Sequence, residues 1–300
     1  MGRKPPPTPA AERSFAASAS ATALFAGAAL CILVATYKVD SQRMNSWRLQ
    51  ALGFAINIIS VSIPGRFDSD IEPGNMNFPW PTLVSPAGFA FAIWGVIYLG
   101  EVAGMAVLAT TEAVSTAVHS SSVAWLCANV AQCLWCASFR PWALERLWLS
   151  SACLAATAYC LVVSQLRLLE LRTHTVGTEA QAWQWALVVM PRSLHAGWVT
   201  AATLVNLNAW AGKAAIGASA AHAAAILSLL SGVSLGDYYA SRGLLLSAAA
   251  VSWALFAVSK GEPVGRDAQA LSAAAIGGFA QAAAGGAALI ALSMAARSFA

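Results

Sequence analysis

Long apolar runs are the feature of this sequence that most restricts its fold. Hydrophobic residues make up 58% of the 300-residue chain and charged residues only 10%, whereas about a quarter of a typical soluble domain is charged. A run of about 20 apolar residues can cross a bilayer as an α-helix. Nine candidate spans lie between short clusters of charge, at residues 15–37, 49–64, 86–109, 122–139, 147–169, 183–211, 219–235, 242–258 and 269–295. The sequence therefore predicts an all-α, polytopic membrane helical bundle with the lipid bilayer as its solvent.

Charge and cysteine usage exclude several other classes of protein. The net charge is only +4 and the basic residues form no aromatic-interleaved patch, so no nucleic acid partner is predicted. All six cysteines lie in apolar segments, including the CxxC of Cys133 and Cys136, which favours buried thiols over disulfides, a metal site or redox chemistry. The sequence shows no glycine-rich phosphate loop, zinc-type His/Glu pair or nucleophile elbow. We therefore expect no catalytic residues, no metal and no required cofactor.

Residues 1–47 differ in character from the rest of the chain. The first fourteen residues are proline-rich and basic, and the apolar run at 15–37 follows them. This run fits a retained transmembrane helix, which we favour, but also a signal anchor or part of a targeting segment removed from the mature protein. An alanine-rich, acid-poor start allows an organelle membrane without selecting one.

The loop at residues 65–85 is long for a helical bundle. It is net acidic, crowded with Gly and Pro, and about twenty residues long. Loops of this length without structure of their own tend to be lids or binding loops. Trp80, which lies between two prolines, is therefore a candidate lid residue.

Two motifs in the right order point to a family. The third span carries Pro86, then Trp94 eight residues later and Tyr98 four residues after that. A later span carries WVTAATLVN, which runs from Trp198 to Asn206, and the segment NVAQCLWCASF between the two motifs matches more loosely. Together these segments resemble the TspO/MBR family (tryptophan-rich sensory protein, translocator protein-like), in its longer form with extra C-terminal helices.

The resemblance implies three regions in the chain. These are an N-terminal tail with a possible helix at 1–47, a five-helix TspO-like core at 48–212, and a three-helix extension at 213–300. A homodimer or a larger membrane complex is the partner state that the resemblance suggests. Three residues depart from the family pattern. Gly88 stands where short members carry a pocket tryptophan, Gln132 stands where they carry an asparagine, and Trp210 stands in place of the tyrosine of the sterol pattern. Cholesterol binding is therefore not expected.

The resemblance also implies a hydrophobic small-molecule ligand of the tetrapyrrole type, a porphyrin or haem, bound for sensing, transport or light-dependent degradation. A tetrapyrrole needs aromatic faces for its ring, polar anchors for its propionates and shielding from water. The candidate ligand-binding residues are Trp94, Tyr98, Gln132, Trp135, Arg192, His195, Trp198, Ala202 and Asn206. In this interpretation the tryptophans and Tyr98 cradle the ring, while Arg192 and Asn206 anchor it. Catalysis would be at most light-dependent porphyrin breakdown.

Residues on the span at 183–211 support this site by their spacing. From Arg192 to Asn206 the five candidates recur at intervals of three and four residues, so they share one helix face. Polar residues in a membrane helix are costly unless they point into the bundle or a cavity. This stripe therefore predicts a binding site or an interior contact.

Other interpretations stay open. Arg192 can instead pair with a protein carboxylate such as Glu101, and His195 can form a helix-to-helix hydrogen bond rather than bind a ligand or its metal. The whole chain can also be a structural or assembly subunit of a larger membrane complex, with a degenerate pocket. A solute transporter is less favoured because no inverted repeat is visible.

Overall fold

All regular secondary structure in the described part of the chain is helical. The computed structural model describes residues 46–63, 65–68, 82–214, 218–261 and 273–298. The helices are α2 (Ser46–Ser62), η1 (Gly88–Ala92), α3 (Ile93–Thr110), α4 (Glu112–His119), α5 (Ser122–Ser138), η2 (Pro141–Arg146), α6 (Leu147–Thr175), α7 (Glu179–Ala214), α8 (Ala218–Ser241), α9 (Leu245–Lys260) and α10 (Ala273–Ser298). The predicted all-α bundle is confirmed, whereas the predicted span at 15–37 and the candidate lid residue Trp80 lie outside the described residues.

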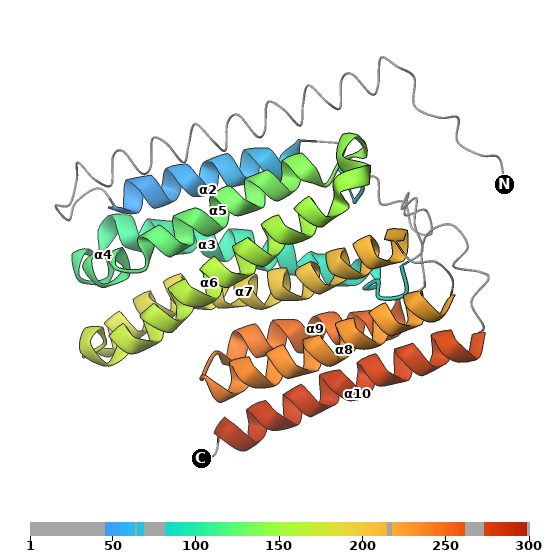
Figure 1. The fold of residues 1–300 in the computed structure, drawn as a ribbon. Helices are drawn as coiled ribbons and strands as arrows, with labels where there is room; N and C mark the ends of the chain where they lie inside the picture. Colours follow the sequence, from blue (N-terminus) through green and yellow to red (C-terminus); the bar gives the residue numbers. More distant parts are fainter. Residues whose placement is uncertain (1–45, 64, 69–81, 215–217, 262–272, 299–300) are drawn as a thin grey trace.

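Helix α7 is the central helix of the bundle (Figure 1). On one side it packs against α3 and α6, and α2 and α5 complete this group of helices. On the other side it packs against α8 and α9, and α10 lies against both of these at the edge of the molecule. The predicted five-helix core and the predicted extension therefore share α7 as a common wall.

The surfaces of the bundle are those of a membrane protein. Four segments are long and apolar enough to cross a membrane, namely Gly88–Thr110, Pro141–Arg172, Ser219–Ser241 and Gly277–Ala296, and α9 is apolar but shorter. Large apolar side chains such as Leu99 and Leu292 point outward, whereas glutamine, asparagine and arginine side chains are buried inside. Lipid tolerates the apolar surface, and the interior satisfies the polar groups.

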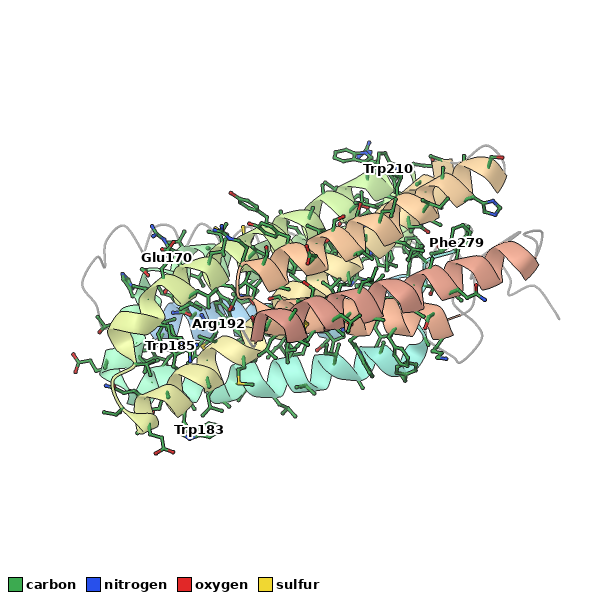
Figure 2. All side chains as sticks on the ribbon, turned by 90° about the horizontal axis from the view of Figure 1, so that it is seen from below. Glu170, Trp183, Trp185, Arg192, Trp210 and Phe279 are labelled. Carbon is green, nitrogen blue, oxygen red and sulfur yellow. The ribbon has the colours of Figure 1, made fainter. Side chains whose placement is uncertain are left out.

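Tryptophans near the ends of α7 differ in exposure. Trp183 is 67% exposed, as expected for a residue at a membrane interface, whereas Trp185 two residues later is buried in the core. Figure 2 shows Trp183 and Trp210 at the outside of the bundle, while Arg192 lies within it.

Helix α7 is crossed at close range by α3 and by α9. Where α3 crosses α7, a Cβ atom on Gly100 would lie 2.7 Å from Cβ of Pro191, and one on Gly104 would lie 3.1 Å from a backbone carbonyl oxygen of α7. Where α9 crosses α7, a Cβ atom on Gly197 would lie only 2.1 Å from the carbonyl oxygen of Ser247. Such approaches between membrane helices require residues without a side chain.

Two details of the helices differ from the sequence expectations. Helix α4 was not predicted because its eight residues, from Glu112 to His119, are too short and too polar to register as an apolar span. Helix α7 is longer than the predicted 183–211 and continues through Pro191. Membrane helices tolerate an internal proline where neighbouring helices or polar groups compensate for the lost hydrogen bond.

Candidate functional site

An apolar cavity of about 100 Å³ lies between α3, α5, α7, α8 and α9. The indoles of Trp94 on α3, Trp135 on α5 and Trp198 on α7 line it. Gly232 on α8 and Leu255 on α9 also line it. Helices α8 and α9 are therefore part of the wall of the cavity.

The aromatic walls of the cavity are ordered by contacts between rings. Trp198 meets Trp94 edge to face, with centroids 6.4 Å apart at 88°, and Phe91 meets Trp198 in the same way at 5.6 Å and 85°. Trp135 stacks on Phe139 at 5.7 Å and 21°. These are favourable aromatic geometries, so the rings hold each other in place around the cavity.

Few polar groups line the cavity. The hydroxyl oxygen of Thr82 is buried and has no hydrogen-bond partner among the described residues. Asn206 Oδ1 accepts a hydrogen bond from Ser150 Oγ at 2.8 Å. Asp68 also lines the cavity and forms an ion pair of 2.8 Å with Arg66, whose guanidinium lies 5.3 Å from the ring of Trp135. The cavity thus offers aromatic faces, neutral polar groups and one ion pair.

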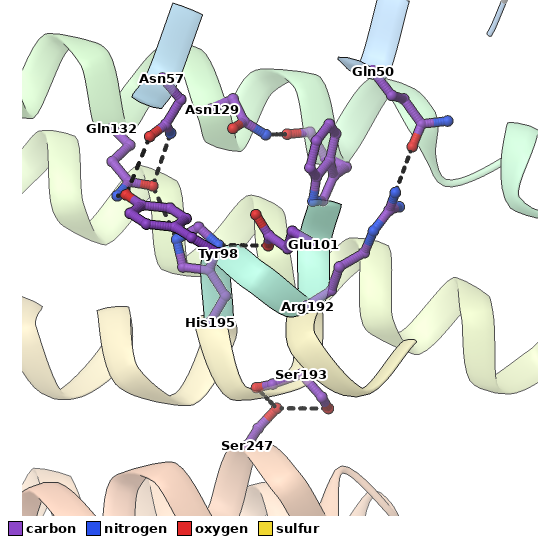
Figure 3. A network of polar contacts seen from close by, with 11 residues as sticks. Gln50, Asn57, Tyr98, Glu101, Asn129, Gln132, Arg192, Ser193, His195 and Ser247 are labelled. Atoms are coloured by element: carbon purple, nitrogen blue, oxygen red, sulfur yellow. Dashed lines mark hydrogen bonds and ion pairs between the residues drawn. The ribbon is translucent and has the colours of Figure 1, made fainter. Parts of the chain in front are cut away.

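A buried polar network lies beside the cavity and joins α2, α3, α5 and α7 (Figure 3). His195 Nδ1 is 2.9 Å from Glu101 Oε1, and its Nε2 is 2.9 Å from Gln132 Oε1. Asn57 Nδ2 donates to Gln132 Oε1 at 3.0 Å, and the Tyr98 hydroxyl contacts both amides at 3.3 and 3.4 Å. All of these residues except Tyr98 are at most 1% exposed. Both ring nitrogens of His195 are therefore engaged by protein atoms.

Arg192 lies at another part of this network. Its Nη2 donates to Gln50 Oε1 at 2.8 Å, and its guanidinium carbon lies 4.4 Å from the ring centroid of Trp125. Gln50 in turn donates to Ser122 Oγ at 2.9 Å. Arg192 is thus held by an amide and an indole, and Glu101 is bonded to His195 instead.

The structure divides the nine candidate ligand-binding residues into two groups. Those that line the cavity are Trp94, Trp135, Trp198, Ala202 and Asn206. Those that belong to the network and do not line the cavity are Tyr98, Gln132, Arg192 and His195. The candidates on α7 fall into both groups because the stripe from Arg192 to Asn206 extends roughly 21 Å along the helix axis, at 1.5 Å per residue, and so passes different neighbouring helices. One face of α7 therefore serves two neighbouring sites.

Sequence reasoning missed several residues that complete these two sites. Gln50 and Asn57 are amides seven residues apart on a largely apolar helix, so their shared face was a signal that the sequence contained. The sequence suggested Glu101 only as a partner of Arg192. No pattern in the sequence indicated that Gly232 and Leu255 close the cavity, because that depends on how α8 and α9 pack.

Comparison with models of protein families finds a match for most of this chain. Residues 42–291 match a family model described as TSPO-like protein. The match includes the helices of the network, those of the cavity and most of α10. Comparison with the curated proteins and with the solved structures finds no match. Since the family model covers most of the sequence, the chain belongs to the TSPO-like protein family.

Proposed function

We propose that this TSPO-like membrane protein binds a flat hydrophobic ligand of the tetrapyrrole class in the cavity walled by α3, α5, α7, α8 and α9. The observation that carries the proposal is the convergence of Trp94, Trp135 and Trp198, from three different helices, on one apolar cavity. Indole rings stack on conjugated ring systems, and an enclosed apolar cavity with few polar groups is the usual form of a small-molecule site.

The size of the cavity restricts how such a ligand would bind. A volume of about 100 Å³ is smaller than the roughly 300–1,000 Å³ of typical small-molecule pockets. A whole macrocycle therefore requires either that the walls move apart or that the ring enters by one edge. Both modes bring the ligand against the three indoles, so both predict quenching of tryptophan emission.

The polar anchors in this proposal differ from those expected from the sequence. Thr82 supplies an unpartnered hydroxyl inside the cavity, and Asn206 supplies an amide. A carboxylate of the ligand would reach Arg66 by replacing Asp68 in its ion pair, because Arg66 contacts both Asp68 and the ring of Trp135, which line the cavity. Arg–carboxylate pairs are among the stronger hydrogen-bonded contacts in proteins.

The test is a titration of the purified, detergent-solubilised protein with protoporphyrin IX, followed by tryptophan emission with scatter and inner-filter controls. We expect saturable quenching, weakened about fivefold in Kd by Trp198→Phe, since an aromatic contact contributes about 1 kcal/mol. Trp183→Phe is the matched control, because Trp183 lies on the same helix but is exposed and does not line the cavity. Linear, non-saturating quenching, or equal effects of the two variants, would refute the proposal.

A second candidate function is that of a structural subunit that docks through α10. Gly277, Gly278 and Gly285 have open space where a Cβ atom would stand, so this glycine-rich face is free to approach another helix closely. The partner would be a second copy or another membrane helix. Substitution of Gly285 by Leu should then reduce the size of the complex extracted in mild detergent, and an unchanged size would exclude this face as the contact.

A further inference from the structure

The network around Glu101 and His195 is buried as completely as any part of the core. Glu101, Gln132, His195 and Asn57 are 0–1% exposed, and they come from four helices (Figure 3). Ionisable side chains inside a membrane bundle are expensive, and they commonly mark functional sites. The proposed cavity does not use this pair, so its role needs a separate account.

The direction of the hydrogen bonds determines how many protons the pair carries. With the two amides in this orientation, Gln132 Oε1 accepts from Asn57 Nδ2 at 3.0 Å and lies 2.9 Å from His195 Nε2, so Nε2 donates a proton to it. A second proton must lie between His195 Nδ1 and Glu101 Oε1, because these atoms are 2.9 Å apart. If Nδ1 and the carboxylate were both bare, two acceptors would face each other.

In this arrangement, His195 and Glu101 together carry one proton more than they would as a neutral imidazole and a carboxylate. The pair is either an imidazolium with a carboxylate or an imidazole with a carboxylic acid, and the two forms differ only in the position of the proton between Nδ1 and Oε1. In both forms the pair has no net charge, which lowers the cost of burying it.

Together with Tyr98, these four side chains also form a consistent network without that proton. If Gln132 and Asn57 each rotate their amide group by half a turn, Gln132 Nε2 donates to the bare Nε2 of His195 and to Asn57 Oδ1. Asn57 Nδ2 then donates to the Tyr98 oxygen, and the Tyr98 hydroxyl donates to Gln132 Oε1. His195 Nδ1 keeps its proton and donates it to the carboxylate of Glu101. No hydrogen bond is lost, because amides and hydroxyls can exchange donor and acceptor roles.

The surroundings of the pair favour uptake and release of a proton. The charged and titratable groups that face it are Tyr98 on α3 and Arg192 on α7, and Arg66 and Cys136 lie within electrostatic reach of Tyr98. Helices α2 and α5 present neutral amides and the indole of Trp125, and α9 meets α7 through Ser247. Four polar atoms beside the pair have no hydrogen-bond partner among the described residues: Glu101 Oε2, Arg192 Nη1, Trp125 Nε1 and Asn129 Oδ1. The two donors among these atoms, Arg192 Nη1 and Trp125 Nε1, can stabilise the carboxylate of Glu101 after the proton leaves.

We propose that the Glu101–His195 pair is a proton-binding site inside the bundle, and that the amides of Gln132 and Asn57 reverse their hydrogen bonds when the proton leaves. The site touches the cavity through one aromatic layer. Trp94 stacks on Tyr98 at 5.1 Å and meets His195 edge to face at 5.4 Å, and it also lines the cavity. The proton site is independent of any ligand in the cavity, and it is tested on the protein alone.

The experiment is infrared spectroscopy of the full-length protein in lipid nanodiscs, recorded from about pH 4 to pH 10, a range wide enough to titrate carboxyl and imidazole groups. We expect a carboxyl or carboxylate signal that titrates in the wild type and is lost in Glu101→Gln. Glu112→Gln is the matched control, because Glu112 is an exposed glutamate on α4 that lies outside the network. Gln132→Leu removes an amide that reverses its hydrogen bonds with the proton, so the change in side-chain amide absorption that accompanies the titration should be smaller in this variant than in the wild type.

Two results would overturn the proposal. One is an identical set of titrating signals in the wild type and Glu101→Gln, and the other is a change in side-chain amide absorption that is the same in Gln132→Leu as in the wild type. If Glu101→Gln does not fold, ¹⁵N NMR of imidazole-labelled wild-type protein decides instead, with the His195 signals assigned by His195→Gln. Protons on both His195 nitrogens, or a proton shared with Glu101, at low pH and a bare Nε2 at high pH support the site. A single unchanging tautomer over the whole range refutes it.

Discussion

The crossing of α7 and α9 at Gly197 gives the sharpest test of the fold. A Cβ atom on Gly197 would lie 2.1 Å from the carbonyl oxygen of Ser247 and 2.8 Å from Cβ of Ala250. Ordinary contact begins at 3.4 Å, so Gly197→Ala requires the first pair of atoms to separate by about 1.3 Å. Neither a backbone carbonyl nor an alanine Cβ can swing away, so the helices themselves must move.

The energetic cost of this movement follows from the contacts at the crossing. Overpacking a well-packed interior costs about 1–3 kcal/mol. Separation also stretches the two hydrogen bonds between Ser193 and Ser247, at 2.8 and 3.2 Å, each of which contributes about 0.6 kcal/mol in a membrane. Alanine regains up to about 1 kcal/mol through its helix propensity. We therefore expect Gly197→Ala to lower the free energy of unfolding by about 1–3 kcal/mol.

The assay is equilibrium unfolding in mixed micelles with increasing dodecyl sulfate, followed by far-UV circular dichroism. The matched control is Gly95→Ala on α3, because Gly95 is also helical but a Cβ atom added to it would have no neighbouring atom within 4 Å. This variant should change stability by no more than about 0.5 kcal/mol. Equal stability of the two variants would refute the close packing of the C-terminal helices on α7.

Three other substitutions probe the cavity, the buried arginine and the surface. Gly232→Leu on α8 should fill the cavity and abolish saturable porphyrin quenching while the protein stays monodisperse; an unchanged Kd would contradict the place of α8 in its wall. Gln50→Leu should cost about 1.5–3 kcal/mol in the same unfolding assay, because Arg192 loses its acceptor, and Gln50→Leu with Arg192→Met should recover part of this loss. Glu145→Gln breaks an exposed ion pair with Lys213 and should cost at most about 1 kcal/mol, so a larger loss would show that the pair is shielded from solvent.

The helices were largely predictable because a membrane imposes a simple rule on sequence. Eight of the nine predicted apolar runs fall on described helices, from α2 to α10, and only the run at 15–37 lies outside the described residues. Helix α4 was not predicted because it is too short and too polar to be recognised as an apolar span. Hydropathy finds segments that the bilayer must accommodate, but it says little about short helices that stabilise a loop.

The site was predictable only in part, since residue spacing gives a helix face but not what lies opposite it. Trp94, Trp135 and Trp198 were placed together by the family motifs, and they do line one cavity. Arg192 and His195 share their face of α7 with Trp198, yet they meet α2, α3 and α5 instead of the cavity. Along one face of a helix, the neighbouring helices change every few turns. The positions of these changes depend on how the helices pack, which the sequence pattern does not reveal.

The glycines of α3 affect how inactive variants of this protein should be interpreted. Pro191 has no N–H group, which leaves the carbonyl of Leu187 without its helical hydrogen bond, and Gly104 lies against that carbonyl while Gly100 lies against the proline ring. Enlarging either glycine would push α3 outward and draw Glu101 away from α7. A genetic screen for loss of function would therefore recover Gly100 and Gly104 beside the ionisable residues, although neither carries any chemistry, and hits at these positions would report the spacing of two helices.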